Sequence, residues 1–308
     1  MKGKKFFFTI ITPAFNAKDF IDEHLKLTNK LVANSNTEVI YVDDSSTDNT
    51  YEKIISNKNP RIKIYKMQKN NGPGICRNYG IKKARGQFVL FLDTDDKINY
   101  KNFLKMNNIL KKKNYNIQDI IFYNFTKKNK NKINPAIRKI NKLQILKNYL
   151  RLEMDMSANL CLFNINFLKK NNLKFKNGVY EDISFMLNCY CKMRNFTNLN
   201  INIYNKFFNQ NSITNTFTDK HLKFFLRSCI QKKIIFEKEI VNKIKNINMK
   251  DLQFGFRGDY VFASKIFKNI KKSKYNKVFI DNFFKKIITN DFIVKTNYDL
   301  YTKKILFN

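Results

Sequence analysis

The sequence is poor in glycine and proline, the residues that break or bend regular structure: its 308 residues include only four prolines and eight glycines. It also has only two histidines and no tryptophan. Glycine and proline this scarce and dispersed argue against long disordered linkers. Apolar residues make up 43% of the chain, 30 of them phenylalanine, which is ample material for a packed core. We therefore expect one large domain or two smaller ones.

Acidic residues are also few. The chain has 24 of them against 59 lysines and arginines, which gives a net charge of +35. Such an excess favours anionic partners, namely nucleic acid, an acidic membrane face or phosphorylated substrates. The basic residues are scattered, and a lysine-rich composition accounts for most of them. The densest patches, 126–142 and 268–277, leave contact with a membrane surface or an anionic ligand open.

Two further absences concern redox chemistry and membranes. The five cysteines are an odd number whose spacing fits neither a disulfide framework nor a zinc site, so we expect structural thiols in a reducing compartment. No apolar run approaches the length that spans a bilayer, about 20 residues. The opening MKGKKFFFTIITP imitates a secretion signal, but its apolar run is short and no small-residue cleavage site follows. A buried first strand in a cytosolic or peripheral protein explains it better.

Apolar runs of strand length alternate with helical patterns in the first 125 residues. We expect strands at 6–11, 38–42, 61–67, 87–92 and 118–125. Helices are expected near 17–32, 51–56 and 75–84, the first capped by Asn16 and the last of them stopped by Gly86. This alternation predicts an α/β fold with a mostly parallel sheet covered by helices on both faces.

The last part of the chain has a different pattern. Large apolar residues at helical spacing among lysines predict a basic α-helical C-terminal region over 216–308. The pattern leaves three roles open for it: packing on the rest of the protein, dimerisation, or lying on an acidic membrane face.

Polar clusters follow three of the predicted strands, at 12–16, 43–48 and 93–96. In a parallel sheet these strand ends share one edge, and ligands bind there. Asp93 and Asp95 point to the same side of an extended chain. Two adjacent carboxylates suit a hard cation such as Mg²⁺ or Mn²⁺, completed by substrate phosphates and water.

The neighbouring clusters suit the rest of a nucleotide. Asp43 and Asp44 are placed to accept hydrogen bonds from a base or a ribose. Arg77 and Asn78 lie near the start of a helix, where backbone N–H groups and a cation face an anionic ligand or a nucleobase. Together these residues predict a nucleoside-diphosphate site with a metal on the diphosphate.

Each of these features also has a purely structural interpretation. A strand followed by D-x-D-D is common in loops, Asp-Asp-Ser-Ser is ordinary turn chemistry, and Arg77 can simply pair with a carboxylate. The order of the clusters and their convergence on one sheet edge favour the site.

The same stretches resemble a known family. TIITPAFNA (9–17), EVIYVDDSSTDNT (38–50), NNGPGICRNYG (70–80), GQFVLFLDTDD (86–96) and VYEDISF (179–185) are similar to family 2 of the inverting glycosyltransferases, which have the GT-A fold. INIYNKFFNQNSIT (201–214) resembles the segment that ends many bacterial capsule and lipooligosaccharide transferases. The resemblance covers 6–214. It implies a GT-A domain over 1–215, with a nucleotide-binding half (1–100) and an acceptor-binding half (101–215).

The resemblance also implies roles for individual residues. It places Pro13, Phe15 and Asn16, from the loop after the first strand, at the nucleotide. Asp43 contacts the base and Asp44 lies next to it. Arg77 also approaches the base, and Asn78 follows it. Asp93, Thr94 and Asp95 form the D-x-D at the metal and the ribose, and Asp96 shares the metal role. Ser45 stands where the family usually has glycine, so it must make a tight turn without glycine's freedom.

The implied mechanism is one direct displacement that inverts the anomeric carbon. Asp182 matches the family's catalytic base and takes the proton of the acceptor hydroxyl. Mn²⁺ or Mg²⁺ stabilises the departing nucleoside diphosphate. A structural interpretation of Glu181-Asp182 also exists, because helix N-termini favour acids.

The remaining expectations concern partners. Glu181, Ser212, Thr214 and His221 are expected on the acceptor side. The donor is expected to be a UDP-sugar, and the acceptor a surface glycan or lipid-linked glycan. The enzyme is then expected in the cytoplasm or peripheral on the cytoplasmic face of the inner membrane, and a homo-oligomer stays open.

Two other classes of protein share some of these features. A nucleotidyltransferase also uses carboxylates, a metal and nucleotides, but it normally has a glycine-rich basic loop near its N-terminus, and ITPAFNAKDF has no glycine. A nucleic-acid-binding protein is suggested by the charge alone, and the chain has no recognisable nucleic-acid module. We therefore expect no specific nucleic-acid partner.

Overall fold

The chain forms two compact units that are discontinuous in sequence. The computed structural model describes residues 6–112, 115–127, 130–132, 141–155, 157–207, 217–241 and 243–289. The first unit comprises 1–139, 157–178 and 192–209, and the second comprises 140–156, 179–191 and 210–308. The division into a nucleotide-binding half, an acceptor-binding half and a region from 216 stays a prediction.

The first unit is built on one sheet, which has nine strands in the described residues. The strands are β1 (Phe6–Ala14), β2 (Thr37–Asp43), β3 (Ile62–Lys66), β4 (Gly86–Phe91), β5 (Lys97–Ile98), β6 (Ile120–Lys127), β7 (Lys130–Lys132), β8 (Cys161–Asn164) and β9 (Phe196–Lys206). Their order is β3-β2-β1-β4-β8-β6-β9-β5, with β7 beside β6. The first four strands in this order are parallel, and β8 runs antiparallel to β4 and β6. The α/β expectation is confirmed.

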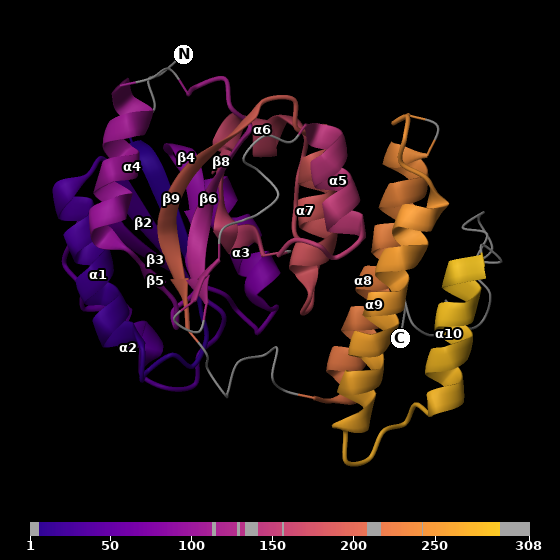
Figure 1. Ribbon diagram of the computed structural model, residues 1–308. Coiled ribbons are helices and arrows are strands. Elements are labelled where there is room, and N and C mark those ends of the chain that lie inside the picture. The colour runs from indigo at the N-terminus through magenta and orange to yellow at the C-terminus, as the bar shows by residue number, and fades with distance from the viewer. Residues whose placement is uncertain are drawn as a thin grey trace. The chain divides into compact units, whose positions relative to one another are not determined.

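Helices cover both faces of this sheet (Figure 1). One face carries α1 (Ile21–Asn34), α2 (Thr50–Ile55) and α4 (Tyr100–Lys112), whose apolar residues share one core with the strands. α3 (Pro73–Lys83) packs on β1 and β2, and α6 (Ile165–Lys170) packs on β4 and β8. In α1, Ile21, Leu25 and Leu31 recur at helical spacing and are buried, as the amphipathic pattern predicts.

Two predicted helix ends are wrong in detail. α1 begins at Ile21 and its N-cap is Phe20, because Asn16 adopts a left-handed φ of 47° and bonds to another loop. Gly86 does not stop α3, which ends at Lys83; it begins β4. A Cβ atom on Gly86 would lie 2.6 Å from the backbone of Phe8 and Thr9, so only glycine fits this strand contact.

The second unit is helical in its described part. It contains α5 (Lys142–Leu150), α7 (Glu181–Lys192), α8 (Asp219–Ile235), a π-helical turn η4 (Phe236–Ile240), α9 (Met249–Lys268) and α10 (Lys277–Thr289). The predicted helical C-terminal region is thus confirmed for its described residues. Inside it, the fully buried Lys232 pairs with the buried Asp259, which compensates both charges away from water.

Two expected absences can be compared with the structure. All five cysteines lie in the described ranges, where they are free thiols. In the part of the chain that the structure describes, no helix combines the length and apolar character needed to cross a membrane.

Candidate functional site

The loops after β1 and β2 meet at the carboxyl edge of the sheet. Ala14 pairs with Asp43 in the parallel register, and the Asp44 amide donates to the Ala14 carbonyl over 2.8 Å. Further out, the Thr47 amide donates to Asn16 Oδ1 over 2.9 Å, and the Asn16 amide donates to Ser46 Oγ over 3.0 Å. β4 ends beside them, since the Leu92 amide bonds to the Ile11 carbonyl at 3.0 Å. The three polar clusters are therefore neighbours in space.

Asp44, at the same edge of the sheet, binds the backbone of a neighbouring loop through both of its carboxylate oxygens. Its Oδ1 accepts the Asn71 amide at 2.8 Å, and its Oδ2 accepts the Gly72 amide at 2.7 Å. Gly72 has a φ of 84°, which glycine adopts without strain. Asp44 thereby holds the NNGPG loop that leads into α3.

Asp43 has one oxygen with nothing to bond to in the described chain. It is fully buried, and its Oδ2 accepts the Ser46 amide at 3.1 Å. Its Oδ1 is buried and has no hydrogen-bond partner among the described residues. A buried acceptor left without a donor costs about 1–3 kcal/mol. At the sheet edge where ligands bind, this atom suits an N–H group of a bound molecule.

Ser45 makes the tight turn that the sequence predicts for it. Its φ is 61°, in the left-handed region. Its hydroxyl donates to the Met67 carbonyl over 2.8 Å, which ties the turn to the end of β3. This bond offsets part of the backbone strain that glycine would avoid.

Arg77 holds the first carboxylate of the D-x-D segment. It is buried on α3, and its Nη2 donates to Asp93 Oδ1 over 2.8 Å. The carbon of its guanidinium also lies 5.9 Å from the ring centre of Phe91 and 5.4 Å from that of Phe175. Although burial alone would raise the pKa of Asp93, Arg77 and the Asn159 amide group hold that pKa below its usual value.

A close helix–strand contact puts Arg77 in this place. A Cβ atom on Gly80 would lie 2.4 Å from Cγ2 of Ile11. Glycine in the segment NYG therefore lets α3 approach β1 directly, and Arg77 lies nearly one turn earlier on the same helix.

Asp96 is bound within the protein. It is buried; its Oδ2 accepts the Tyr204 hydroxyl at 2.7 Å and its Oδ1 accepts the Phe207 amide at 2.9 Å. Burial and the nearby charge of Asp93 raise the pKa of Asp96 to about 7. These bonds favour a structural role, and its expected share in metal binding stays a prediction.

Asp93 and Asp95 fit a divalent cation better. Each Asp93 oxygen accepts one hydrogen bond and keeps a further lone pair, and the side chain is 33% exposed. Thr94 and Asp95 follow, half-buried, in a turn. No group of three or more His, Cys, Asp or Glu side chains in the described ranges is arranged to hold a metal. Two carboxylates completed by donor phosphates and water remain compatible with this arrangement.

The other predicted nucleotide residues differ in their availability. Phe15 is 44% exposed beside Asn16, and Pro13 is half-buried. The Asn78 side chain, in contrast, is engaged: Nδ2 donates to the Phe175 carbonyl at 2.9 Å and Oδ1 accepts the Phe175 amide at 2.9 Å. A nucleotide contact by Asn78 stays a prediction.

The predicted acceptor-side residues belong to the second unit. Glu181, which is buried, and Asp182, which is half-buried, form the first turn of α7. The helix N-terminus by itself favours acids there, so their catalytic roles stay predictions. His221 bonds through Nδ1 to Thr218 Oγ1 at 2.7 Å at the start of α8, and burial lowers its pKa. Ser212 and Thr214 lie outside the described residues.

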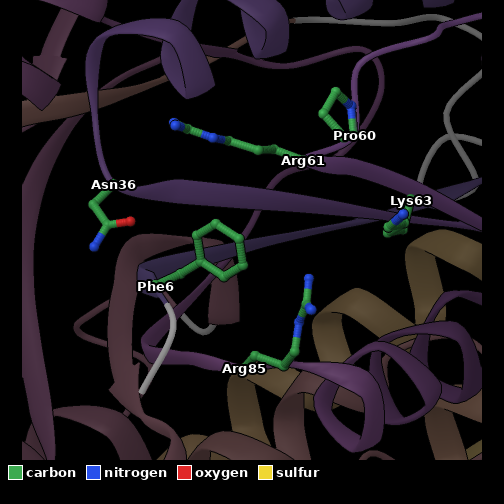
Figure 2. Close-up of a pocket in the computed structure, with 6 residues that line it drawn as sticks. All are labelled: Phe6, Asn36, Pro60, Arg61, Lys63 and Arg85. Atoms are coloured by element: carbon green, nitrogen blue, oxygen red, sulfur yellow. The ribbon is translucent and has the colours of Figure 1, made fainter. Parts of the chain in front are cut away.

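A cavity of about 530 Å³ lies at the opposite edge of the sheet (Figure 2). It is lined by residues at the amino ends of the strands: Phe6, Asn36, Pro60, Arg61, Lys63 and Arg85. Its arginines are already bound. Arg85 pairs with the buried Glu38 at 2.8 Å, and Arg61 donates to the Val32 carbonyl at the end of α1 over 2.7 Å. This cavity is thus distant from the carboxylates along the strands, and both of its arginines have structural partners.

Sequence reasoning missed two residues that touch the carboxylates. Asn159 Nδ2 donates to Asp93 Oδ2 over 2.7 Å, and Tyr204 bonds to Asp96. Tyr204 lies in the stretch 201–214 that resembles the family, and this resemblance could have pointed to it. Asn159 lies in a short 3-10 turn, Ala158–Leu160, and no motif indicates it.

Comparisons with known proteins show which family the sequence resembles. The sequence model described as "Glycosyl transferase family 2" matches residues 9–171. The chain is 29% identical over 208 residues to a poly(ribitol-phosphate) beta-glucosyltransferase of Bacillus spizizenii. That match covers 60% of this chain but only 30% of the relative, so the chain spans less than a third of the relative's length.

Solved structures are similar in fold. A crystal structure of Staphylococcus aureus TarS 1–349 with UDP-GlcNAc has a TM-score of 0.61 and 18% identity, covering 92% of this chain and 89% of that chain. The mannosyltransferase PcManGT of Pyrobaculum calidifontis, with GDP-Man and Mn²⁺, has a TM-score of 0.50 and 14% identity, covering 84% and 75%. At these identities the likeness shows the fold alone.

Proposed function

Because this chain belongs to glycosyl transferase family 2, we propose that it transfers a sugar from a nucleoside diphosphate donor, most simply a UDP-sugar, to an acceptor hydroxyl. One observation carries the proposal. Asp43, at the end of β2, has a buried oxygen with no hydrogen-bond partner among the described residues. Asp93 and Asp95, which are partly exposed, follow β4 at the same edge of the sheet. A base N–H and a metal-bound diphosphate satisfy both features.

The donor is held from its two ends. Asp43 accepts from the base, and the exposed ring of Phe15 offers a flat apolar face beside it. Asp93 and Asp95 would hold Mn²⁺ or Mg²⁺, because both ions prefer hard oxygen ligands. Support for UDP and for manganese comes from structural neighbours that contain UDP-GlcNAc in one case and Mn²⁺ with GDP-Man in the other.

The chemistry is a single displacement with inversion. Asp182 accepts the proton of the acceptor hydroxyl as that oxygen bonds to the anomeric carbon and the nucleoside diphosphate leaves. When bound, the divalent cation supplies a Lewis acid that stabilises the charge of the leaving group. Arg77 keeps Asp93 ionised and oriented, so the carboxylate stays available throughout.

The acceptor is proposed to be a cell-surface glycan, free or lipid-linked. The relative's name, poly(ribitol-phosphate) beta-glucosyltransferase, points to an anionic polymer, and a net charge of +35 suits such a partner. Contact with an acidic membrane is supported by α9, where Phe254, Arg257, Val261 and Lys265 are exposed at helical spacing on one face.

Calorimetry with purified protein tests the donor site. UDP, GDP, CDP and two UDP-sugars are titrated with Mn²⁺ and with EDTA, into the wild type and Asp95→Asn. Glu52→Gln, an exposed carboxylate on α2, is the matched control. We expect metal-dependent binding of UDP and one UDP-sugar that only Asp95→Asn loses. A wild type that binds none of these ligands contradicts the proposed function.

No observation favours the two rival classes. The loop after β1 has no glycine, unlike the signature loop of a nucleotidyltransferase, and the family match supports sugar transfer. Binding of any DNA with a steep salt dependence, in the absence of nucleotide-sugar binding, would favour the nucleic-acid class instead.

A further inference from the structure

One side-chain network joins the D-x-D segment to two distant parts of the sheet. Asn159 Nδ2 donates to Asp93 Oδ2 at 2.7 Å and to the Tyr204 hydroxyl at 2.9 Å. The Tyr204 hydroxyl in turn donates to Asp96 Oδ2 at 2.7 Å and accepts the Asp93 amide at 3.5 Å. The network therefore runs from one carboxylate to the other through two neutral side chains.

The donor groups of this network are all used and its centre is buried, whereas the acceptor Oδ1 of Asn159 has no hydrogen-bond partner among the described residues. Both N–H bonds of the Asn159 amide group are used, and the Tyr204 hydroxyl uses its one donor and both acceptor positions. Asn159 is 2% exposed and Tyr204 is fully buried. Hydrogen bonds to ionised groups in such surroundings are stronger than neutral ones, and removing one partner leaves a buried carboxylate short of a donor.

The backbone of this network is anchored independently of the carboxylates. Asn159 lies in the 3-10 turn before β8, and its carbonyl accepts the hydroxyl of Tyr123, which is buried on β6. Tyr204 lies on β9, which pairs with β6 and β5. Tyr204 thus belongs to the sheet, and Asn159 belongs to a turn that is bonded to the sheet through Tyr123, while the two aspartates lie in a loop.

We infer that Asn159 and Tyr204 are positioning residues for the donor: they hold Asp93 and Asp96 so that Asp93 and Asp95 present their carboxylates together to a metal-bound diphosphate. This inference rests on the proposed function. It also divides the three aspartates: Asp96 fastens the loop to Tyr204 and the Phe207 amide, and Asp93 and Asp95 face the ligand.

The test compares UDP affinity in Mn²⁺ and in EDTA for Tyr204→Phe and Asn159→Ser. Tyr204→Phe removes only the hydroxyl, and Asn159→Ser removes the donor to Asp93. Tyr260→Phe is the matched control, because its hydroxyl donates to Asp281 at 2.8 Å in the second unit. Circular dichroism and the melting temperature check that each variant folds.

We expect both variants to lose about tenfold or more of the affinity measured with Mn²⁺ and much less of the affinity in EDTA, with the control unchanged. A purely structural role would lower both affinities alike. If one variant does not fold, the other decides. If the wild type binds UDP–Mn²⁺ and the variants bind it as tightly, this inference alone is overturned. If the wild type binds no nucleotide, the proposed function is overturned and this role with it.

Discussion

Arg77 and Asp93 form an ion pair of 2.8 Å in which the guanidinium is 4% exposed and the carboxylate 33% exposed. The buried member is thus on a helix and the accessible member is in the D-x-D segment. Arg77 thus holds Asp93 from inside the protein while part of the carboxylate stays exposed.

We predict that Arg77→Met raises the pKa of Asp93 towards its ordinary value and lowers the free energy of unfolding by about 1.5–3 kcal/mol, the range for a hydrogen bond to a charged group. UDP–Mn²⁺ binding weakens with it. Arg77→Lys keeps the charge but not the planar fork, and recovers only part of the loss. Urea unfolding and calorimetry measure both effects. Equal nucleotide binding in all three proteins would show that Asp93 needs no partner.

Asp43→Asn is predicted to change base preference. The asparagine oxygen keeps the bond to the Ser46 amide, so its NH₂ group occupies the position of the open Oδ1. A donor then replaces an acceptor opposite the N3–H of uracil. We expect UDP affinity to fall about tenfold or more and the preference for UDP over CDP to shrink. Competition binding with the two nucleotides measures it. An unchanged ratio would place the base away from Asp43.

Asp182→Asn is predicted to abolish transfer and leave donor binding intact. The amide keeps the shape of the side chain but cannot take a proton, and general base catalysis contributes about 10²–10⁴-fold. Glu52→Gln, at an exposed carboxylate on α2, is the control. Transfer is followed by UDP release with an acceptor present, and binding by calorimetry. Loss of UDP binding in Asp182→Asn would remove this residue from the role of base.

His24 is predicted to make the first unit less stable in mild acid. It is buried and bonds through Nδ1 to the Tyr41 hydroxyl at 2.7 Å, and burial lowers its pKa from 6.5 to about 4. Between these values the unfolded chain binds a proton that the folded chain does not, so stability falls as pH drops from 6.5 towards 4. From pH 7 to pH 5 the loss is about 2 kcal/mol.

The variant His24→Asn keeps an acceptor for Tyr41 and removes the titrating group. Urea unfolding at the two pH values therefore shows a smaller loss in the variant than in the wild type, since all other groups titrate alike in both. An equal loss in the two proteins would mean that His24 is protonated in the folded state.

The amino-acid sequence by itself predicted most elements of the first 127 residues and their order, together with the helical character of the last part, but not β5, β7, β8, β9 or the helices α4 to α7. β1, β2, β3, β4 and β6 lie within a few residues of the predicted strands, because alternation and apolar runs record which positions are buried. The polar clusters after three strands predicted one edge, because parallel strands must end together. The family resemblance also predicted a local conformation: Ser45 stands where glycine is usual and has a left-handed φ of 61°.

Only the tertiary structure showed what Asp96 does in DTDD. Alternation along an extended chain places Asp93 and Asp95 on the same side, but no local pattern indicates that Tyr204, 108 residues further on, bonds to Asp96. Asn16 looked like a helix cap until the loop after β2 supplied its partner, Thr47. Such partners depend on the order of strands across the sheet, with β9 reaching β4 only by way of β6 and β8. No local pattern of spacing or propensity contains that order, because it is set by which surfaces the folded elements bury against one another.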